Sequence, residues 1–225
     1  MPRGHLRLIL SRYRAVWDRI FCDSSYVTER IGNDGSAWRI VPSMLPAVPI
    51  VISGGAGGDI SFELELAQRM NAEVFLFDPS PTGINTLQGI RELPKRLHFF
   101  SVGLAGKSGP VLFREPESAS EGSFAKVIGN TDSISFECTT LAEVVRLNSL
   151  SRVDILKLDI EGFEYDVLES MLADGIAPTQ LAVEVHHFLP GIRYAQTVAL
   201  VAKLYWFGYR LIYKSRQDLL FLKKS

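Results

Sequence analysis

Two periods of hydrophobic residues run along the chain, and they predict which segments form strands and which form helices. Short, mostly apolar runs predict buried strands at residues 50–53, 73–77, 97–102, 153–158 and 181–185. Apolar residues at helical spacing predict helices over 61–70, 163–172 and 194–207, and a capping-box spacing predicts one more from Thr140 through Leu147. Strands that alternate with helices in this way form a parallel sheet covered by helices.

The two ends of the chain depart from this alternation. Near the C-terminus, β-prone segments at 209–213 and 219–222 are too close in sequence for a crossover helix, so they predict an antiparallel hairpin. Near the N-terminus, 26–31 and 37–41 flank a Gly-Asn-Asp-Gly turn and predict a second hairpin. Residues 5–21 predict a basic amphipathic helix; it either packs on its own domain, which we favour, or lies on a membrane surface.

Together these elements predict an α/β protein with a Rossmann-like sheet, mostly parallel, that ends in the antiparallel C-terminal hairpin. Pro42, Pro46 and Pro49 mark a linker. We therefore divide the chain into an annex of helix and hairpin at 1–47 and a main domain at 48–225. Because an open α/β sheet binds its ligand at the carboxyl ends of its strands, the residues that follow each strand are the candidates for function.

Composition narrows the function classes. The 225 residues carry a formal net charge of −1, which gives no basic footprint for nucleic acid or an anionic membrane. No apolar run approaches the roughly 20 residues that span a bilayer, and the N-terminus does not have the pattern of a signal peptide. With only Cys22 and Cys138, a disulfide scaffold is not expected, so the sequence predicts a soluble cytoplasmic protein.

A glycine-rich loop, residues 54–59, directly follows the first strand of the main domain. Glycines let a ligand approach the backbone closely, and the N-terminus of the following helix presents free N–H groups. A dinucleotide-binding fingerprint would place its third glycine where Ile60 stands, and Asp59 would repel a pyrophosphate but attract a cationic amino group or sulfonium. The loop therefore favours a cofactor other than a dinucleotide, although a tight turn without a ligand is the simpler alternative.

Asp78 ends the second strand of the main domain, twenty residues after Gly58. A carboxylate at that place can accept hydrogen bonds from both hydroxyls of a ribose. The sequence Asp78-Pro79-Ser80-Pro81 also has the chemistry of a simple turn. Its distance from the glycine loop favours a ligand that contains a nucleoside.

The densest group of polar residues closes the fourth strand, in the segment Lys157-Leu158-Asp159-Ile160-Glu161-Gly162. Charges in so apolar a strand are costly unless they are paired or used. We interpret Lys157 as one half of a structural ion pair, with Glu184 on the neighbouring strand as its candidate partner. Asp159 and Glu161 follow where the strand opens to the pocket, and we assign them to function.

The fifth strand contributes Glu184 and His186, which are two residues apart and so lie on one face. His186 could act as a general base toward a hydroxyl acceptor, or it could hydrogen-bond to a carboxylate and order the pocket. Asp159, Glu161, Glu184 and His186 could also hold a divalent metal. We treat metal binding as the weaker alternative and predict no metal ligands.

Several of these stretches together resemble the FkbM-type family of S-adenosylmethionine-dependent methyltransferases, and the resemblance extends from about residue 26 to the C-terminus. The stretches that carry it are 53–63, Phe77-Asp78-Pro79-Ser80-Pro81, Val102-Gly103-Leu104, 153–164 and Val183-Glu184-Val185-His186. The Lys-Leu-Asp-Ile-Glu-Gly block within 153–164 is the most specific of them. The resemblance implies the class I methyltransferase fold for the main domain, with a sheet that ends in a reversed strand.

The resemblance also implies how S-adenosylmethionine would be held. The methionine part would lie in the cradle formed by Gly55, Ala56, Gly57, Gly58 and Asp59. The ribose would lie at Asp78 and Pro79, and the adenine near Ser101, Val102 and Gly103. Asp159 and Glu161 would lie between sulfonium and acceptor. From their chemistry, we expect His186 or Asp159 to remove the proton of the acceptor hydroxyl, and Glu184 is a further catalytic candidate.

We therefore predict an S-adenosylmethionine-dependent methyltransferase, with a hydroxyl of a sugar or small natural product as its acceptor. A small-molecule or glycan acceptor is expected, with no nucleic-acid partner, and an oligomer is possible. Residues 104–138 are expected to form a flexible wall over the acceptor site. Two alternatives stay open: an NAD- or FAD-binding oxidoreductase, and a catalytically silent methyltransferase fold that acts as a binding or scaffold subunit.

Overall fold

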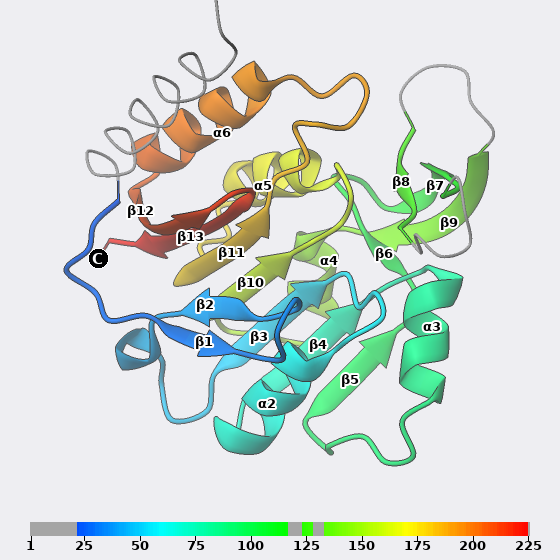
Figure 1. The fold of residues 1–225 in the computed structure, drawn as a ribbon, viewed down its shortest axis with the longest axis horizontal. Helices are drawn as coiled ribbons and strands as arrows, with labels where there is room; N and C mark the ends of the chain where they lie inside the picture. Colours follow the sequence, from blue (N-terminus) through cyan, green and yellow to red (C-terminus); the bar gives the residue numbers. More distant parts are fainter. Residues whose placement is uncertain (1–21, 117–122, 128–132, 225) are drawn as a thin grey trace, which may run out of the picture.

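The computed structural model describes residues 22–116, 123–127 and 133–224 and is built around a seven-stranded sheet (Figure 1). The strand order is β12-β13-β11-β10-β3-β4-β5. Neighbouring parallel strands are β3 (Ile50–Gly54), β4 (Glu73–Phe77), β5 (Leu97–Phe100), β10 (Ile155–Leu158) and β11 (Gln180–Glu184). β13 (Asp218–Lys223) runs antiparallel to β11 and to β12 (Tyr209–Ser215). The predicted strands and the antiparallel C-terminal hairpin are thus confirmed.

Helices cover both faces of this sheet (Figure 1). On one face, strand residues such as Leu156 form a core with α4 (Leu141–Leu147), α5 (Glu164–Ala173) and α6 (Tyr194–Trp206). On the other face, α2 (Ser61–Arg69) and α3 (Pro81–Gln88) pack over strand residues such as Val51. Because both faces are buried, the strands read as nearly continuous apolar runs, which is why they were predictable.

The N-terminal hairpin is also confirmed, as β1 (Glu29–Ile31) paired with β2 (Trp38–Ile40). The hairpin belongs to the same apolar core as α2, and Gln180 of β11 forms hydrogen bonds with Val41, the residue that follows β2. The Gln180 side chain donates a hydrogen bond to the Val41 carbonyl (2.9 Å) and accepts one from the Val41 N–H (2.8 Å). A 3₁₀ turn at Pro42–Met44 then leads into β3. The helix predicted at 5–21 lies outside the described residues.

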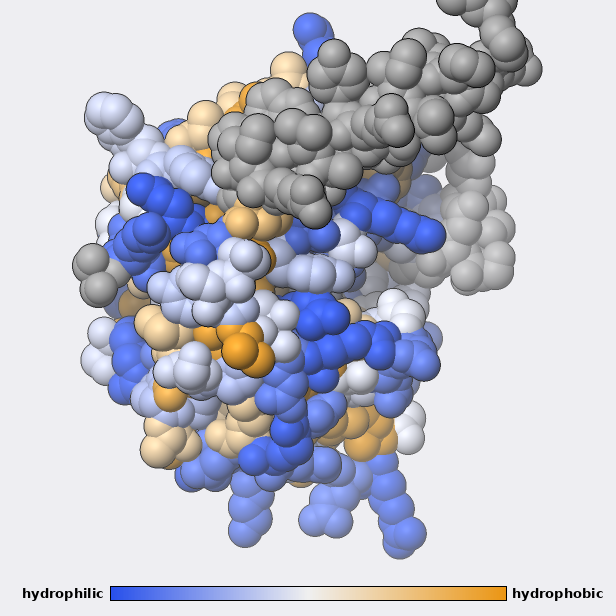
Figure 2. Space-filling view, turned by 60° about the vertical axis from the view of Figure 1, so that its left-hand side comes forward, coloured by the Kyte–Doolittle hydropathy of each residue, from blue (hydrophilic) through white to orange (hydrophobic). Residues whose placement is uncertain are grey.

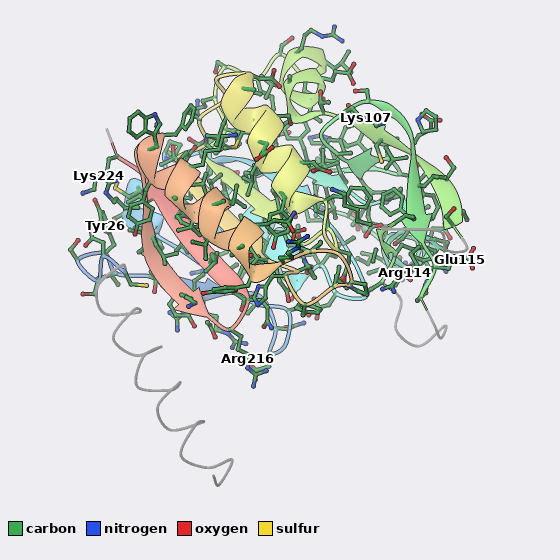
Figure 3. The ribbon with its side chains drawn as sticks, turned by 90° about the horizontal axis from the view of Figure 1, so that it is seen from above. Tyr26, Lys107, Arg114, Glu115, Arg216 and Lys224 are labelled. Atoms are coloured by element: carbon green, nitrogen blue, oxygen red, sulfur yellow. The ribbon has the colours of Figure 1, made fainter. Side chains whose placement is uncertain are left out.

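A second, four-stranded sheet lies beside the main one, in the order β6-β9-β7-β8. Its strands are β6 (Gly103–Leu104), β7 (Gly109–Arg114), β8 (Ala125–Lys126) and β9 (Ser133–Thr139). Seen from above, it carries Arg114 and Glu115 at one end of the molecule, with Tyr26 and Lys224 at the opposite end (Figure 3). Most of the described residues in 104–138 therefore lie in strands, where the sequence predicted only a flexible wall.

Helix α3 begins at Pro81, where only a turn was expected. Ser80 is its N-cap, because its hydroxyl accepts a hydrogen bond from the Gly83 N–H (3.0 Å), and Pro81 occupies the first helical position. The predicted strand 97–102 is shorter than expected, since after Phe100 the chain leaves the main sheet and pairs in β6.

Around the β12 edge of the main sheet, hydrophilic side chains surround small apolar spots (Figure 2).

Candidate active site

A cavity of about 250 Å³ lies at the carboxyl ends of the central strands β3, β4 and β10. Its lining includes most of the predicted site residues, namely Gly55, Ala56, Gly57, Gly58, Asp59, Asp78, Pro79, Gly103, Asp159, Glu161 and Glu184. Ser101 and Val102 do not line it, and Ser101 is exposed. His186 is buried behind the acidic wall of the cavity rather than on its surface. The site thus lies where the fold predicts it.

The glycine loop between β3 and α2 packs closely against the backbone of Asp159 at its first residues and borders open space at its last. Gly55 has φ +90°, and a Cβ there would meet the carbonyl oxygen of Asp159 at 1.9 Å. At Gly57 and Gly58, by contrast, a Cβ would meet no atom within 4 Å. Gly55 is therefore required by packing, whereas Gly57 and Gly58 leave space on the cavity side that a ligand can use.

Asp78 fastens the glycine loop to the end of β4. One carboxylate oxygen accepts hydrogen bonds from the N–H groups of Ala56 (2.8 Å) and Gly57 (3.1 Å), and the other accepts from the Ser80 N–H (2.7 Å). The residue is only 6% exposed. A carboxylate has about four acceptor positions, so these three bonds leave little capacity for the ribose hydroxyls. Asp78 shapes the loop, and its contact with a ribose stays a prediction.

Asp59 joins the glycine loop to the first turn of α2 and to the N-terminal hairpin. Its carboxylate accepts hydrogen bonds from the Ser61 N–H (2.6 Å) and from the Asn33 amide (3.1 Å). The Ser61 bonds, with the Asn33 bond, hold the pKa of Asp59 below its usual value. Asp59 is thus an ionised group on the cavity wall, able to pair with a cationic group of a ligand.

Lys157 and Glu63 form a buried pair beneath the glycine loop. The Lys157 ammonium donates to the Gly55 carbonyl (2.5 Å) and lies 3.9 Å from the Glu63 carboxylate, which also accepts from the Ser53 hydroxyl (2.6 Å). The ion-pair interpretation is confirmed, but the partner proposed for Lys157 was wrong: it is Glu63 of α2 and not Glu184. Burial raises the pKa of Glu63, and the charge of Lys157 opposes that shift.

A cluster of carboxylates surrounds His186 at the carboxyl end of β11. Its Nε2 lies 3.3 Å from Glu161 and 3.7 Å from Asp159, while its Nδ1 lies 3.2 Å from Glu164. Glu164 is fully buried and also accepts from the N–H groups of His186 and Gly162, both at 2.8 Å. Glu161 has φ +51°, a left-handed conformation rare outside glycine, and this turn brings it to His186. The backbone strain at Glu161 therefore lies at the boundary between the cavity and the carboxylate cluster.

The carboxylates set the protonation of His186. Burial alone would lower its pKa, but the hydrogen bond to Glu164 and the charges of Glu164, Glu161 and Asp159 raise it to about 9. His186 is therefore an imidazolium at neutral pH, which argues against the general-base role predicted for it. Burial, followed by the charge of Asp159, raises the pKa of Glu184 to about 7. Glu184 is thus the group whose proton affinity suits a base near neutral pH.

Asp159, Glu184 and His186 each offer a ligand atom within 4.8 Å of the others. Such a set can bind a divalent cation only when the imidazole is neutral. Both ring nitrogens of His186 face carboxylates instead, and the raised pKa keeps them protonated. As the structure stands, three carboxylates form an ion-pair cluster around His186.

Two parts of the cavity wall were not predicted, the N-terminal hairpin and the start of β13, and a third part lies in the segment 104–138 that was expected to form a wall. The N-terminal hairpin contributes Gly35 through Trp38, the small sheet contributes Phe113 with Phe124 just before β8, and β13 contributes its first residue, Asp218. Phe113 packs against Phe163 (ring centroids 4.5 Å apart) and Phe136 (5.1 Å), so aromatic rings contact one another on this side of the cavity. Apolar residues at alternate positions in 133–139 were the signal that could have revealed the strands of this wall.

Residues 54–211 match the family model described as the methyltransferase FkbM domain. The match begins at the glycine loop and ends in β12, so it includes all the parallel strands that follow β3 and the carboxylate cluster. None of the curated proteins matches this chain. Within the described residues, the helices are all too short or too polar to cross a membrane.

Proposed function

The chain belongs to the FkbM family of methyltransferases, and we propose that it transfers a methyl group from S-adenosylmethionine to a hydroxyl oxygen of a small-molecule or glycan acceptor. One observation carries the proposal. The cavity has a glycine loop with open space on one side and a group of carboxylates, including Glu184, on the other. The loop suits a cofactor with an amino acid part, and the carboxylates suit a positive sulfonium and an acceptor that must lose a proton.

The residues of the cavity suit the two ends of this cofactor, the methionine part and the adenine. The open side of Gly57 and Gly58 receives the methionine part, and the ionised Asp59 is available to its ammonium group. Leu104 and Phe113 offer an apolar wall for the adenine, in place of the exposed Ser101. When bound, S-adenosylmethionine supplies an activated methyl group, so the protein mainly has to align the acceptor oxygen with it.

In this proposal Glu184 takes the proton of the acceptor hydroxyl, and Asp159 positions the hydroxyl beside it. His186 does not touch the acceptor; its imidazolium holds Asp159 and Glu161 in place from behind. A carboxylate whose pKa is close to neutral is half ionised at pH 7 and can accept a proton as the new bond forms. A cytoplasmic location and the oligomeric state stay predictions.

A thermal-shift titration tests the cofactor assignment. S-adenosylmethionine and S-adenosylhomocysteine are each added to the wild type, to Asp78→Ala and to Asp34→Ala, with NAD as a parallel ligand. A ligand at about 100 times its dissociation constant stabilises a fold by about 2.7 kcal/mol, a shift of several degrees. We expect that shift in the wild type and in Asp34→Ala, whose carboxylate is 96% exposed. Asp78→Ala should lose it, since the glycine loop loses its anchor.

Other outcomes would contradict the proposal in different ways. A shift with NAD alone would favour the oxidoreductase alternative. No shift with any of the three ligands would favour the catalytically silent alternative. With an acceptor in hand, Glu184→Gln should retain the shift with S-adenosylhomocysteine and lose turnover; full turnover in that variant would remove Glu184 as the base.

A further inference from the structure

A second cavity, of about 270 Å³, continues from the candidate active site beneath the N-terminal hairpin. The two cavities share four lining residues, Gly35, Ala37, Trp38 and Asp218. From this junction the second cavity extends between β2 and the strands β12 and β13, as far as Tyr213 and Leu220. Leu220 is two residues beyond Asp218 on β13, which corresponds to about 7 Å along the strand.

The junction lies beside the proposed base. Glu184 and Asp218 are directly paired across β11 and β13, and Glu184 lines the first cavity while Asp218 lines both. A molecule that occupies the second cavity can therefore place one end beside Glu184 without entering the part of the first cavity that the glycine loop lines. Its other end would lie about one sugar ring away, between the hairpin and β12.

The far end of the second cavity is basic. Arg39 stacks over the ring of Tyr213, with its guanidinium carbon 4.7 Å from the ring centroid, and donates one hydrogen bond to the Thr28 hydroxyl (3.0 Å). No carboxylate among the described residues forms an ion pair with it, whereas Arg30 at the rim is already paired with Asp34. A guanidinium held in one orientation, with its remaining N–H groups unused by an acid, is suited to a carboxylate or phosphate.

From this arrangement we propose that the second cavity is the acceptor subsite, and that it selects acceptors bearing an oxyanion, a carboxylate or a phosphate, about one sugar ring from the reacting hydroxyl. The proposal rests on the proposed function, since it takes the first cavity as the cofactor site. Arg39 binds the oxyanion, and the hydroxyl lies at the junction beside Glu184. Arg39 at one end of the second cavity is positive, and the carboxylates at the junction are negative. These opposite charges determine the orientation in which the acceptor binds.

Trp38 allows a direct binding test, because it lines both cavities. The chain has three tryptophans, so Trp17→Phe with Trp206→Phe leaves Trp38 as the only fluorescent one. This protein, saturated with S-adenosylhomocysteine, is titrated with D-glucuronate, D-glucose 6-phosphate and D-glucose. We expect a saturable change with at least one of the two acids, at least tenfold tighter than with glucose. Which acid binds better distinguishes a carboxylate from a phosphate acceptor.

Arg39→Gln should weaken the binding of the acid at least tenfold and leave the affinity for S-adenosylhomocysteine unchanged. The matched control is Arg210→Gln, which removes an arginine that also stacks on a tyrosine, Tyr205, but lines neither cavity. The control should bind the acid as the parent does. Equal binding of glucose and the acids, no binding of either acid, or an unaffected Arg39→Gln variant would each overturn the proposal. Failure of S-adenosylhomocysteine itself to bind would instead contradict the proposed function.

Discussion

Replacing Lys157 by Met is expected to destabilise the protein in a way that depends on pH. The variant leaves Glu63, whose side chain is 2% exposed, with the Ser53 hydroxyl but without a cation. A buried carboxylate without a cation is neutralised rather than left charged. From its ordinary pKa of 4.5, protonation costs about 1.36 kcal/mol per pH unit, so about 3.4 kcal/mol at pH 7 and about 0.7 kcal/mol at pH 5.

The lost hydrogen bond from Lys157 to the Gly55 carbonyl adds about 1 kcal/mol at either pH. The total is about 4 kcal/mol at pH 7 and about 2 kcal/mol at pH 5. The sign follows from linkage: above pH 4.5 the folded variant holds a proton that the unfolded chain releases, so its stability falls as the pH rises. In the wild type, the charge of Lys157 favours the ionised form of Glu63, so the free energy of unfolding depends less on pH than in the variant.

Urea unfolding of the wild type and of Lys157→Met at pH 5 and pH 7 measures the difference directly. The double variant Lys157→Met/Glu63→Gln is the control, because a neutral amide can still accept the Ser53 hydrogen bond and needs no cation. It should recover most of the loss at pH 7 and show no added pH dependence. An equal loss at both pH values, or no recovery in the double variant, would show that Glu63 is already neutral in the native protein and would refute the reasoning.

Three further predictions concern the loop, the hairpin and the carboxylate cluster. Gly55→Ala should lower the melting temperature far more than Gly57→Ala, since only the first Cβ would meet a backbone oxygen, at 1.9 Å; equal losses would argue against that close approach. Gln180→Leu leaves the Val41 N–H without a partner, at about 1–3 kcal/mol, and leaves the Val41 carbonyl with the Met44 N–H alone (3.2 Å); hydrogen exchange should be faster at Val41 than in the wild type. His186→Gln should cost most stability below pH 6.5, and the loss should shrink as the pH rises through about 9, because the native state holds the His186 proton over that range; a loss independent of pH in thermal melts would contradict the imidazolium.

The main sheet was predictable because its strands are buried on both faces and so appear as apolar runs between helices. The small sheet was not predicted because its strands do not form such apolar runs. In β7 and β9 the exposure alternates, and their polar residues make the pattern resemble that of a loop. Helix α3 was missed for a local reason, since Ser80-Pro81 suits a turn as well as a helix start, and only the packing of Leu87 in the core decides between them.

The candidate site was predictable up to the point at which side chains from separate elements meet. The position of Asp78 after a strand and the glycines of the loop are local features, so the sequence contains them. The partner of Lys157 is not local, because Glu63 reaches it from a helix on one face of the sheet. The charge of His186 is less local still, since it depends on carboxylates contributed by the β10–α5 turn and by α5 itself.

Under the proposed function, the carboxylate cluster would link cofactor binding to the protonation state of Glu184. Asp159 lies between His186 and the cavity, and its negative charge is one reason why the pKa of Glu184 is about 7. A positive group that entered the cavity beside Asp159 would act in the opposite direction and lower the pKa of Glu184. Glu184 would then be fully ionised only when such a group is present. For the proposed reaction, this coupling would prepare Glu184 as the base when the methyl donor is in place and leave it partly protonated otherwise.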